Sequence, residues 1–297
     1  MSRIKESGSD KLFGIINFTI VNIILIIVIF PLIHVVSCSI SSPDLVSRGQ
    51  VILIPRGLTF EGYLRIFRED DLLIGYGNTI MYTVLGTLLN LFLTLPTGYA
   101  LSKKEMPGRN IFMTYFIITM YFSGGLIPTF LLVKSLGLFN TRTVLILLGG
   151  VSVYNVIICR TFFAGIPKEL EDAAIIDGCS TYRTFLQIVL PLSKALIGVM
   201  VLYYGVGHWN SYFTAMIYVM DNNKKPLQLF LRKILIIEQM NVQMTGEFGE
   251  DVSRAALQLK ELLKYSVIIV ASLPVLVLYP FLQKYFDKGV LIGSIKG

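Results

Sequence analysis

Six stretches of this sequence are long and apolar enough to cross a lipid bilayer as helices. A spanning helix needs about 20 mostly apolar residues, because it rises about 1.5 Å per residue through a hydrocarbon core about 30 Å thick. The predicted spans are Leu12–Val36, Asn78–Leu101, Ile111–Val133, Thr143–Phe163, Leu192–Val219 and Leu262–Leu282. We therefore expect an all-α membrane protein with six transmembrane helices.

The composition favours the same class. Only 15% of the 297 residues are charged and 54% are hydrophobic, whereas a soluble domain carries about 25% charged residues. The net charge of +7 comes from scattered Lys and Arg, which argues against a nucleic-acid surface. Cys38, Cys159 and Cys179 lack the spacing of a metal site or a disulfide framework, so we expect no bound metal.

Basic segments give an orientation, since short loops rich in Lys and Arg stay in the cytoplasm. The loop Lys103–Arg109 holds three cations, and both ends of the chain are basic: Arg3, Lys5 and Lys11, then Lys284, Lys288 and Lys296. All three segments fall on one side of a six-span topology, so we expect both termini to be cytoplasmic. The predicted parts are a cytoplasmic segment 1–11, a six-helix domain 12–284 with a cytoplasmic loop at 165–191 and external loops at 39–77 and 220–261, and a cytoplasmic tail 285–297.

The predicted spans lack the groups of a self-powered transporter. They contain His34 and His208 but no carboxylate, whereas ion-coupled carriers usually hold Asp, Glu or His relays inside the membrane. The sequence has no GxxxxGK[ST] nucleotide loop and no HExxH or GxSxG motif. We therefore expect that the chain is not an enzyme and that any energy source lies in another subunit.

The loop between the fourth and fifth spans is unusually acidic. Pro167 favours the start of a helix, and Glu169, Glu171 and Asp172 suit its first turns because of the helix dipole. Gly178 is placed to end that helix in a left-handed conformation. Ser180 is placed to cap a second helix that ends near Pro191. A polar re-entry loop with solvated charges explains the same residues, and the pattern alone leaves both interpretations open.

Asp172-Ala173-Ala174, Gly178, Ile188, Leu190 and Pro191 resemble the EAA signature of the membrane subunits of ABC importers. Asp172 stands where the signature usually has Glu. Four more segments resemble the carbohydrate permeases of this family, in particular those for complex oligosaccharides: Tyr121–Leu138, Tyr154–Phe163, Gly207–Tyr218 and Leu273–Gly297. The resemblance implies the type I importer permease fold and covers nearly the whole chain.

The resemblance also implies partners. They are a second homologous permease, two ABC ATPase subunits and an extracytoplasmic sugar-binding protein, with ATP and Mg on the ATPases and no cofactor on this chain. In such permeases the EAA loop forms a coupling helix that docks on the ATPase. The corresponding residues here are Glu171, Asp172, Ala173, Ala174, Asp177, Gly178, Ile188 and Pro191. In maltose-type relatives a C-terminal tail reaches between the ATPases, which makes Gly293, Ser294 and Lys296 candidate contacts; a loose anchor is the alternative.

Candidates for the sugar pathway lie in the third and fifth spans. Aromatic rings stack on sugars and amides bind hydroxyls, so we consider Tyr203, Tyr204, Trp209, Asn210 and Tyr212. Aromatic residues also favour the membrane interface, which is the alternative. The run Ser123–Pro128 interrupts the third span and makes Gly124, Gly125 and Pro128 candidate hinge residues, although close helix packing also explains the glycines.

Three other functions compete with oligosaccharide import. An ABC permease for another solute would share the EAA loop, but the C-terminal resemblance argues against it. A secondary sugar carrier is disfavoured by the absence of carboxylates from the spans. A secondary carrier would need no ATPase, and a membrane scaffold without transport would show no sugar-dependent stimulation of an ATPase.

Overall fold

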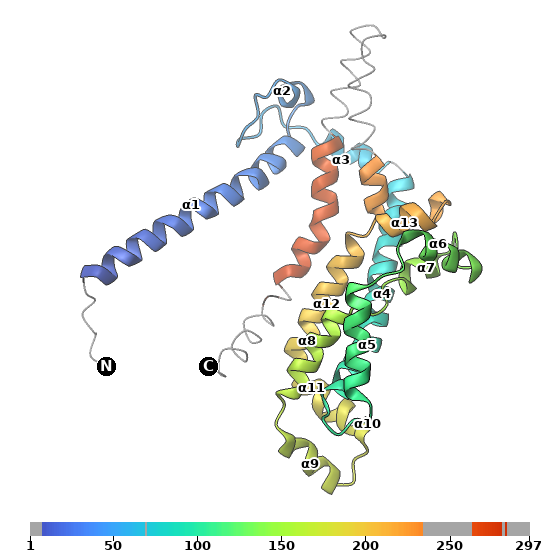
Figure 1. Cartoon of the computed structure of the whole chain (residues 1–297). Helices are drawn as coiled ribbons and strands as arrows, with labels where there is room; N and C mark the ends of the chain where they lie inside the picture. Colours follow the sequence, from blue (N-terminus) through green and yellow to red (C-terminus); the bar gives the residue numbers. More distant parts are fainter. Residues whose placement is uncertain (1–7, 69, 234–262, 281–282, 284–297) are drawn as a thin grey trace. The chain divides into compact units, whose positions relative to one another are not determined.

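The computed structural model describes residues 8–68, 70–233, 263–280 and 283. Within these ranges every regular element is helical (Figure 1). The chain forms two compact units, which contain residues 8–68 with 263–272, and 70–232 with 273–280. Three described helices are long and apolar enough to cross a membrane, or up to five if each of two bent helix pairs counts as one span.

The first unit contains α1 (Gly8–Ser39), α2 (Pro43–Ser47) and α3 (Glu61–Ile66). α1 contains the whole first predicted span. The segment that follows folds back onto the end of α1: the Ser37 hydroxyl donates to the Leu53 carbonyl at 2.6 Å, and the Tyr63 hydroxyl donates to Ser39 Oγ at 2.7 Å. These bonds close the loop that joins α1 to α3.

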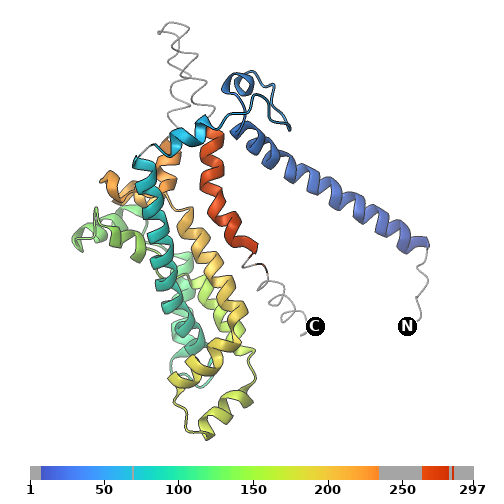
Figure 2. The same ribbon diagram turned by 180° about the vertical axis from the view of Figure 1, so that it is seen from behind.

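The second unit is built around α4 (Asp70–Ser102), which contains the second predicted span. α4 packs against α8 (Val153–Ala164) on one side and α12 (Lys194–Trp209) on another, as both views show (Figures 1 and 2). The main apolar core lies between these helices and η1 (Phe185–Val189), a π-helical segment. Its buried residues are Leu95, Tyr99, Cys159, Phe163, Phe185, Val189, Leu196, Met200 and Tyr204.

The third predicted span, Ile111–Val133, is not one straight helix. It consists of α5 (Arg109–Tyr121) and α6 (Leu126–Ser135), which are bent by 111° at the break between them. Gly125 caps α6 with φ +84°, a conformation that most residues avoid. The interruption predicted at Ser123–Pro128 is therefore confirmed.

The fourth predicted span, Thr143–Phe163, is also divided. α7 (Arg142–Leu147) and α8 are separated at Gly149 and Gly150, and Gly149 has φ +86°. Asn90 of α4 donates to both glycine carbonyls, at 3.0 and 2.8 Å. Non-helical backbone within a membrane protein must find such partners, because lipid offers none.

The fifth predicted span, Leu192–Val219, contains two helices. α12 is followed by α13 (Phe213–Tyr218), a 3₁₀ turn η2 (Asn222–Lys224) and a helix at 227–233. The predicted sixth span, Leu262–Leu282, corresponds to a described helix at Leu263–Pro280. Between α8 and α12 the chain forms α9 (Lys168–Ile176), α10 (Thr181–Thr184), η1 and α11 (Leu190–Leu192).

Two glycines of α4 test how closely its neighbours pack. A Cβ at Gly98 would lie 2.6 Å from Cys159 Cβ and 3.2 Å from the Arg160 backbone nitrogen, so Gly98→Ala should force α8 away. We expect Gly98→Ala to destabilise the protein by about 1–3 kcal/mol, measured as a lower melting temperature in detergent. Gly77 has no atom within 4 Å of its would-be Cβ. Gly77→Ala should therefore be neutral or stabilising, and equal melting temperatures for both variants would contradict the packing described.

Candidate functional site

The acidic helix α9 ends as its sequence predicts. The Gly178 N–H donates to the Ile175 carbonyl at 3.0 Å, and the Cys179 N–H donates to the Ala174 carbonyl at 2.9 Å. With Gly178 at φ +79°, this is the Schellman arrangement that closes a helix on a left-handed residue. The prediction that Gly178 ends the helix in a left-handed conformation is confirmed. Pro167 precedes the helix as its N-cap, one position before the first turn.

The second helix of the loop also begins as predicted, since Ser180 Oγ accepts the Arg183 N–H at 3.4 Å. The chain continues through α10, η1 and α11, and α11 ends at Leu192, next to Pro191. Ser193 then interrupts the helix, and its hydroxyl donates to the Val189 carbonyl at 2.7 Å. The segment Thr181–Leu192 meets α12 at an angle of 83°, so the loop joins α12 through a sharp corner.

One face of α9 is open to the surroundings. Ile175 and Ile176 are 63% and 86% exposed, and Asp172 and Asp177 are exposed as well. Ala174 is buried, while Ala173 lies on the surface. Exposed apolar side chains beside charges are typical of a surface that binds a partner protein. In both views α9 lies at the end of the second unit that is far from α13 (Figures 1 and 2).

Two side chains of α9 tie the helix to the segment that follows α4. Glu171 forms an ion pair with Lys103, and Lys168 forms one with Glu105 at 2.6 Å. The hydrogen bond from Lys168 holds the pKa of Glu105 below its ordinary value, and the same bond raises the pKa of Lys168. The second pair is therefore fully charged at neutral pH, and it is lost as the pH falls through the lowered pKa of Glu105.

An aromatic cluster lies beneath the Lys103–Glu171 pair. Lys103 Nζ lies 4.4 Å from the centre of the Tyr99 ring, and the Tyr99 hydroxyl makes a long hydrogen bond of 3.5 Å to Glu171 Oε2. Tyr99 stacks on Phe185 at 4.8 Å and meets Phe163 edge-on at 5.8 Å. Sequence reasoning missed Tyr99 and Lys103 because nothing in the local pattern places them beside Glu171, which is 72 and 68 positions away from them.

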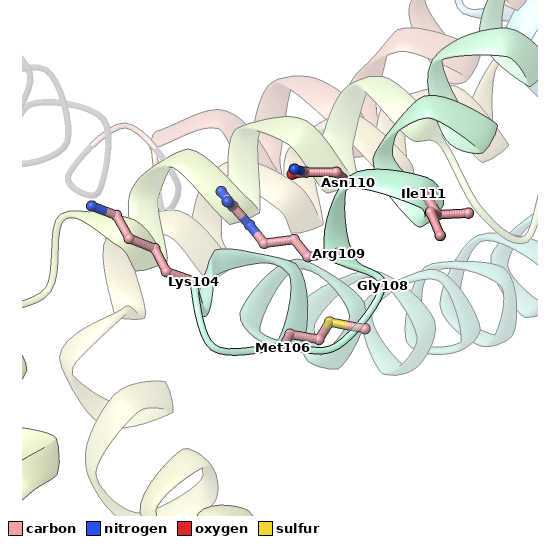
Figure 3. Close-up of a pocket in the computed structure, with 6 residues that line it drawn as sticks. All are labelled: Lys104, Met106, Gly108, Arg109, Asn110 and Ile111. Carbon is pink, nitrogen blue, oxygen red and sulfur yellow. The ribbon is translucent and has the colours of Figure 1, made fainter.

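The rest of the 103–109 segment forms a shallow hollow of about 260 Å³ (Figure 3). Lys104, Arg109 and Asn110 extend from it in the same general direction, and Arg109 Nε donates to the Leu101 carbonyl at 2.8 Å. That bond fixes the turn between α4 and α5 next to Lys103. Among the residues that the structure describes, no group of three or more His, Cys, Asp or Glu side chains is arranged to hold a metal ion.

The predicted sugar-pathway residues of the fifth span divide into two groups. Trp209 is 5% exposed and packs edge-on against Tyr76 at 5.7 Å, while Tyr204 is 6% exposed and shares a 2.7 Å hydrogen bond with Thr94. These two side chains pack within the chain. In contrast, Tyr203, Asn210 and Tyr212 are exposed.

The exposed group has two neighbours on the helix at 227–233. Gln228 Nε2 donates to Asn210 Oδ1 at 3.4 Å, and the Arg232 guanidinium lies 4.8 Å from the centre of the Tyr212 ring. In the third predicted span, Gly124, Gly125 and Pro128 are exposed around the break between α5 and α6. The tail residues Gly293, Ser294 and Lys296 lie outside the described part of the chain.

A polar node that the sequence did not reveal joins α4, α12 and the connection between α7 and α8. Nε2 of His208 donates to Asn90 Oδ1 at 2.7 Å, while the Asn90 amide donates to Gly149 and Gly150. Asn90 is fully buried. A Cβ at Gly86 would lie 2.5 Å from the His208 ring, so the glycine leaves room for this contact.

Comparison with known proteins gives near-complete matches. A family described as "Binding-protein-dependent transport system inner membrane component" matches residues 72–292. The chain is 38% identical to protein LplC of Bacillus subtilis (strain 168) over 98% of this chain and 97% of that protein. It is 39% identical to the polygalacturonan/rhamnogalacturonan transport system permease protein YtcP of the same strain, over 97% of this chain and 99% of the relative.

A solved structure has a similar fold. It is described as a crystal structure of a bacterial ABC transporter involved in the import of the acidic polysaccharide alginate. One of its chains matches with a TM-score of 0.84 and 32% identity, over 96% of this chain and all of that one.

Replacing Asn90 by leucine tests the polar node. The change keeps the approximate size but leaves the Gly149 and Gly150 carbonyls and His208 without their partner and removes the hydrogen bonds of a buried side chain, so we expect a loss of about 1–3 kcal/mol in stability. Thermal unfolding in detergent measures it. Asn110→Leu, at an exposed position of α5, serves as the matched control. A node without structural importance would give the two variants the same melting temperature.

Proposed function

This chain belongs to the family of binding-protein-dependent transport system inner membrane components, and from that premise we propose that it forms one half of the translocation pore of an ATP-driven oligosaccharide importer. It is a multi-pass protein of the cell (inner) membrane. The finer topology we propose has six spans and cytoplasmic termini. In it α5 and α6 together form the third span, α7 and α8 the fourth, and α12 and α13 the fifth.

The geometry of α9 is the observation that carries the proposal. The helix is short, is closed by the Schellman arrangement at Gly178, and exposes acidic and apolar side chains on one face. Its two ends lead into α8 and, through the 83° corner, into α12. A rigid helix joined at both ends to membrane helices is suited to transmit the movement of a docked partner.

The partner that docks here is an ABC ATPase subunit in this proposal. Asp172 supplies the negative charge of the EAA signature, and Ile175 and Ile176 add exposed apolar area beside it. The remaining residues of the proposed docking region are Ala173, Ala174, Asp177, Gly178, Ile188 and Pro191. Glu171, also expected there from the signature, is turned to Lys103 of this chain instead. ATP and Mg bind to the ATPase, and this chain binds no cofactor.

The complete transporter contains a second homologous permease, two ATPase subunits and an extracytoplasmic binding protein. The binding protein delivers the sugar, and closure of the ATPases on ATP moves the coupling helices, so that the pore alternates between outward and inward access. The exposed residues Tyr203, Asn210 and Tyr212 are our candidates for contact with the sugar. Trp209 and Tyr204 then support the pathway by packing behind it, and Gly124, Gly125 and Pro128 serve as a hinge.

Charge reversal on α9 tests the docking proposal. We expect Asp172→Lys, and Gly178→Pro, which disrupts the turn after the helix, to lower ATP-driven sugar uptake by about tenfold or more in reconstituted vesicles. Both variants should still reach the membrane. Asp71→Lys reverses a charge at an exposed position in the first turn of α4 and should leave uptake unchanged. Wild-type uptake by both α9 variants would exclude this docking site, and uptake without any ATPase would instead identify a secondary carrier.

The substrate we propose is an acidic oligosaccharide. YtcP is named for polygalacturonan and rhamnogalacturonan, and the solved relative is described as importing an acidic polysaccharide. These polymers carry carboxylates on their sugar rings. In this chain the Arg232 guanidinium lies over Tyr212, one of the candidate pathway residues. A guanidinium beside an aromatic ring is suited to bind a carboxylated sugar, since Arg pairs with carboxylates.

A panel of loaded binding proteins tests the substrate class. We expect the binding protein with an oligogalacturonide to stimulate ATP hydrolysis at least about fivefold more than with a neutral glucan of equal length, because only the acidic sugar offers a carboxylate to the Arg232 guanidinium. Equal stimulation would exclude acidic selectivity. If neither sugar stimulates hydrolysis but an amino acid or peptide does, the chain belongs to an importer of a non-sugar solute.

A further inference from the structure

The two ion pairs that hold α9 differ in their surroundings. The Lys103 and Glu171 side chains are 25% and 14% exposed, whereas those of Lys168 and Glu105 are 68% and 63% exposed. Exposed ion pairs contribute little because water and salt screen them. The Lys103–Glu171 contact is therefore the one that can fix the position of α9.

The Lys103–Glu171 pair lies against a cluster of packed aromatic rings. Tyr99 contacts both charged groups, through its ring face to Lys103 and through its hydroxyl to Glu171. The Tyr99 ring in turn packs against Phe185 from η1 and Phe163 from α8, both of which are buried. The single side chain of Glu171 thus connects α9 to α4, and through Tyr99 to α8 and η1.

α9 has little else to hold it in place. Of its nine residues only Ala174 is buried, and a proline and a left-handed glycine flank the helix at Pro167 and Gly178. A helix joined to its neighbours by turns can pivot about those turns when a partner pushes it. If the contact between α9 and the end of α4 is kept during this movement, α4 moves together with α9. If the contact is absent, only the turns at the ends of α9 change conformation.

We propose that the Lys103–Glu171 pair mechanically links α9 to α4, so that Glu171 acts as a positioning residue inside this chain while the adjacent Asp172 faces the ATPase. The inference rests on the proposed function and deepens it. Successive residues of a helix point about 100° apart, and the two carboxylates differ accordingly: Glu171 is turned to Lys103 and Asp172 is exposed. Movement of α9 then reaches α4, whose Asn90 contacts His208 of α12.

The test uses the complete transporter, with both permeases, the ATPases and the binding protein, reconstituted in vesicles. The quantity measured is sugar taken up per ATP hydrolysed. We expect Lys103→Glu and Glu171→Lys each to lower this ratio about five- to tenfold. The ATPase should still copurify with each variant in wild-type amounts, because the docking face is intact.

The exchange of both charges separates a specific contact from a general charge effect. The double variant Lys103→Glu with Glu171→Lys restores an ion pair at the same place, so we expect its ratio to return to within about twofold of wild type. Lys104→Glu makes the same charge change on the neighbouring exposed residue and should leave the ratio unchanged. If a single variant fails to accumulate in the membrane, Glu171→Gln removes the charge at constant size and should lower the ratio likewise.

Three results would overturn the inference. The first is a wild-type ratio of sugar to ATP in both Lys103→Glu and Glu171→Gln. The second is loss of the ATPase from Glu171→Lys, which would make Glu171 a docking contact. The third is a double variant that is present in the membrane but remains uncoupled. The proposed function fails in a different way. In that case the wild-type complex itself shows no uptake that depends on ATP and the binding protein.

Discussion

Hydrogen bonds from the side chains of α4 to interrupted backbone elsewhere are the interactions on which the second unit depends. Asn90 donates to the two glycine carbonyls between α7 and α8, and the Tyr82 hydroxyl donates to the Lys224 carbonyl at 2.7 Å. Thr79 Oγ1 accepts the Leu227 N–H at 2.8 Å, at the start of the helix 227–233. Lipid cannot replace these partners. α4 therefore supports two breaks, the one between α7 and α8 and the one before the helix 227–233.

This role explains which parts of the fold could be predicted from the sequence. α1 and α4 were predicted well, because an uninterrupted apolar run reports directly on a long helix. The divisions within the fourth and fifth predicted spans were missed, since hydropathy averages over a window and does not depend on where backbone hydrogen bonds are broken. The break at Ser123–Pro128 was predicted because two glycines and a proline mark it locally.

The candidate site shows the same division between local and distant information. Gly178 and Ser180 could be assigned from neighbouring residues alone, because caps and left-handed turns are formed by residues two to five positions apart. The burial of Trp209 and Tyr204 and the pairing of Glu171 with Lys103 could not be assigned, since each depends on a helix brought close by the fold. Residue type suggested a sugar contact for Trp209, but its packing against Tyr76 gives it a supporting place in the chain.

The native cysteines give the turn after α9 its own chemical reporter. Cys38 and Cys159 are buried, whereas Cys179 is half-buried and directly follows Gly178. Its backbone N–H belongs to the bond pair that closes α9, so its sulfur moves with the end of that helix. A thiol reagent of limited reach therefore modifies the unaltered protein first at this corner, and the rate of labelling reports how open the corner is without any engineered residue.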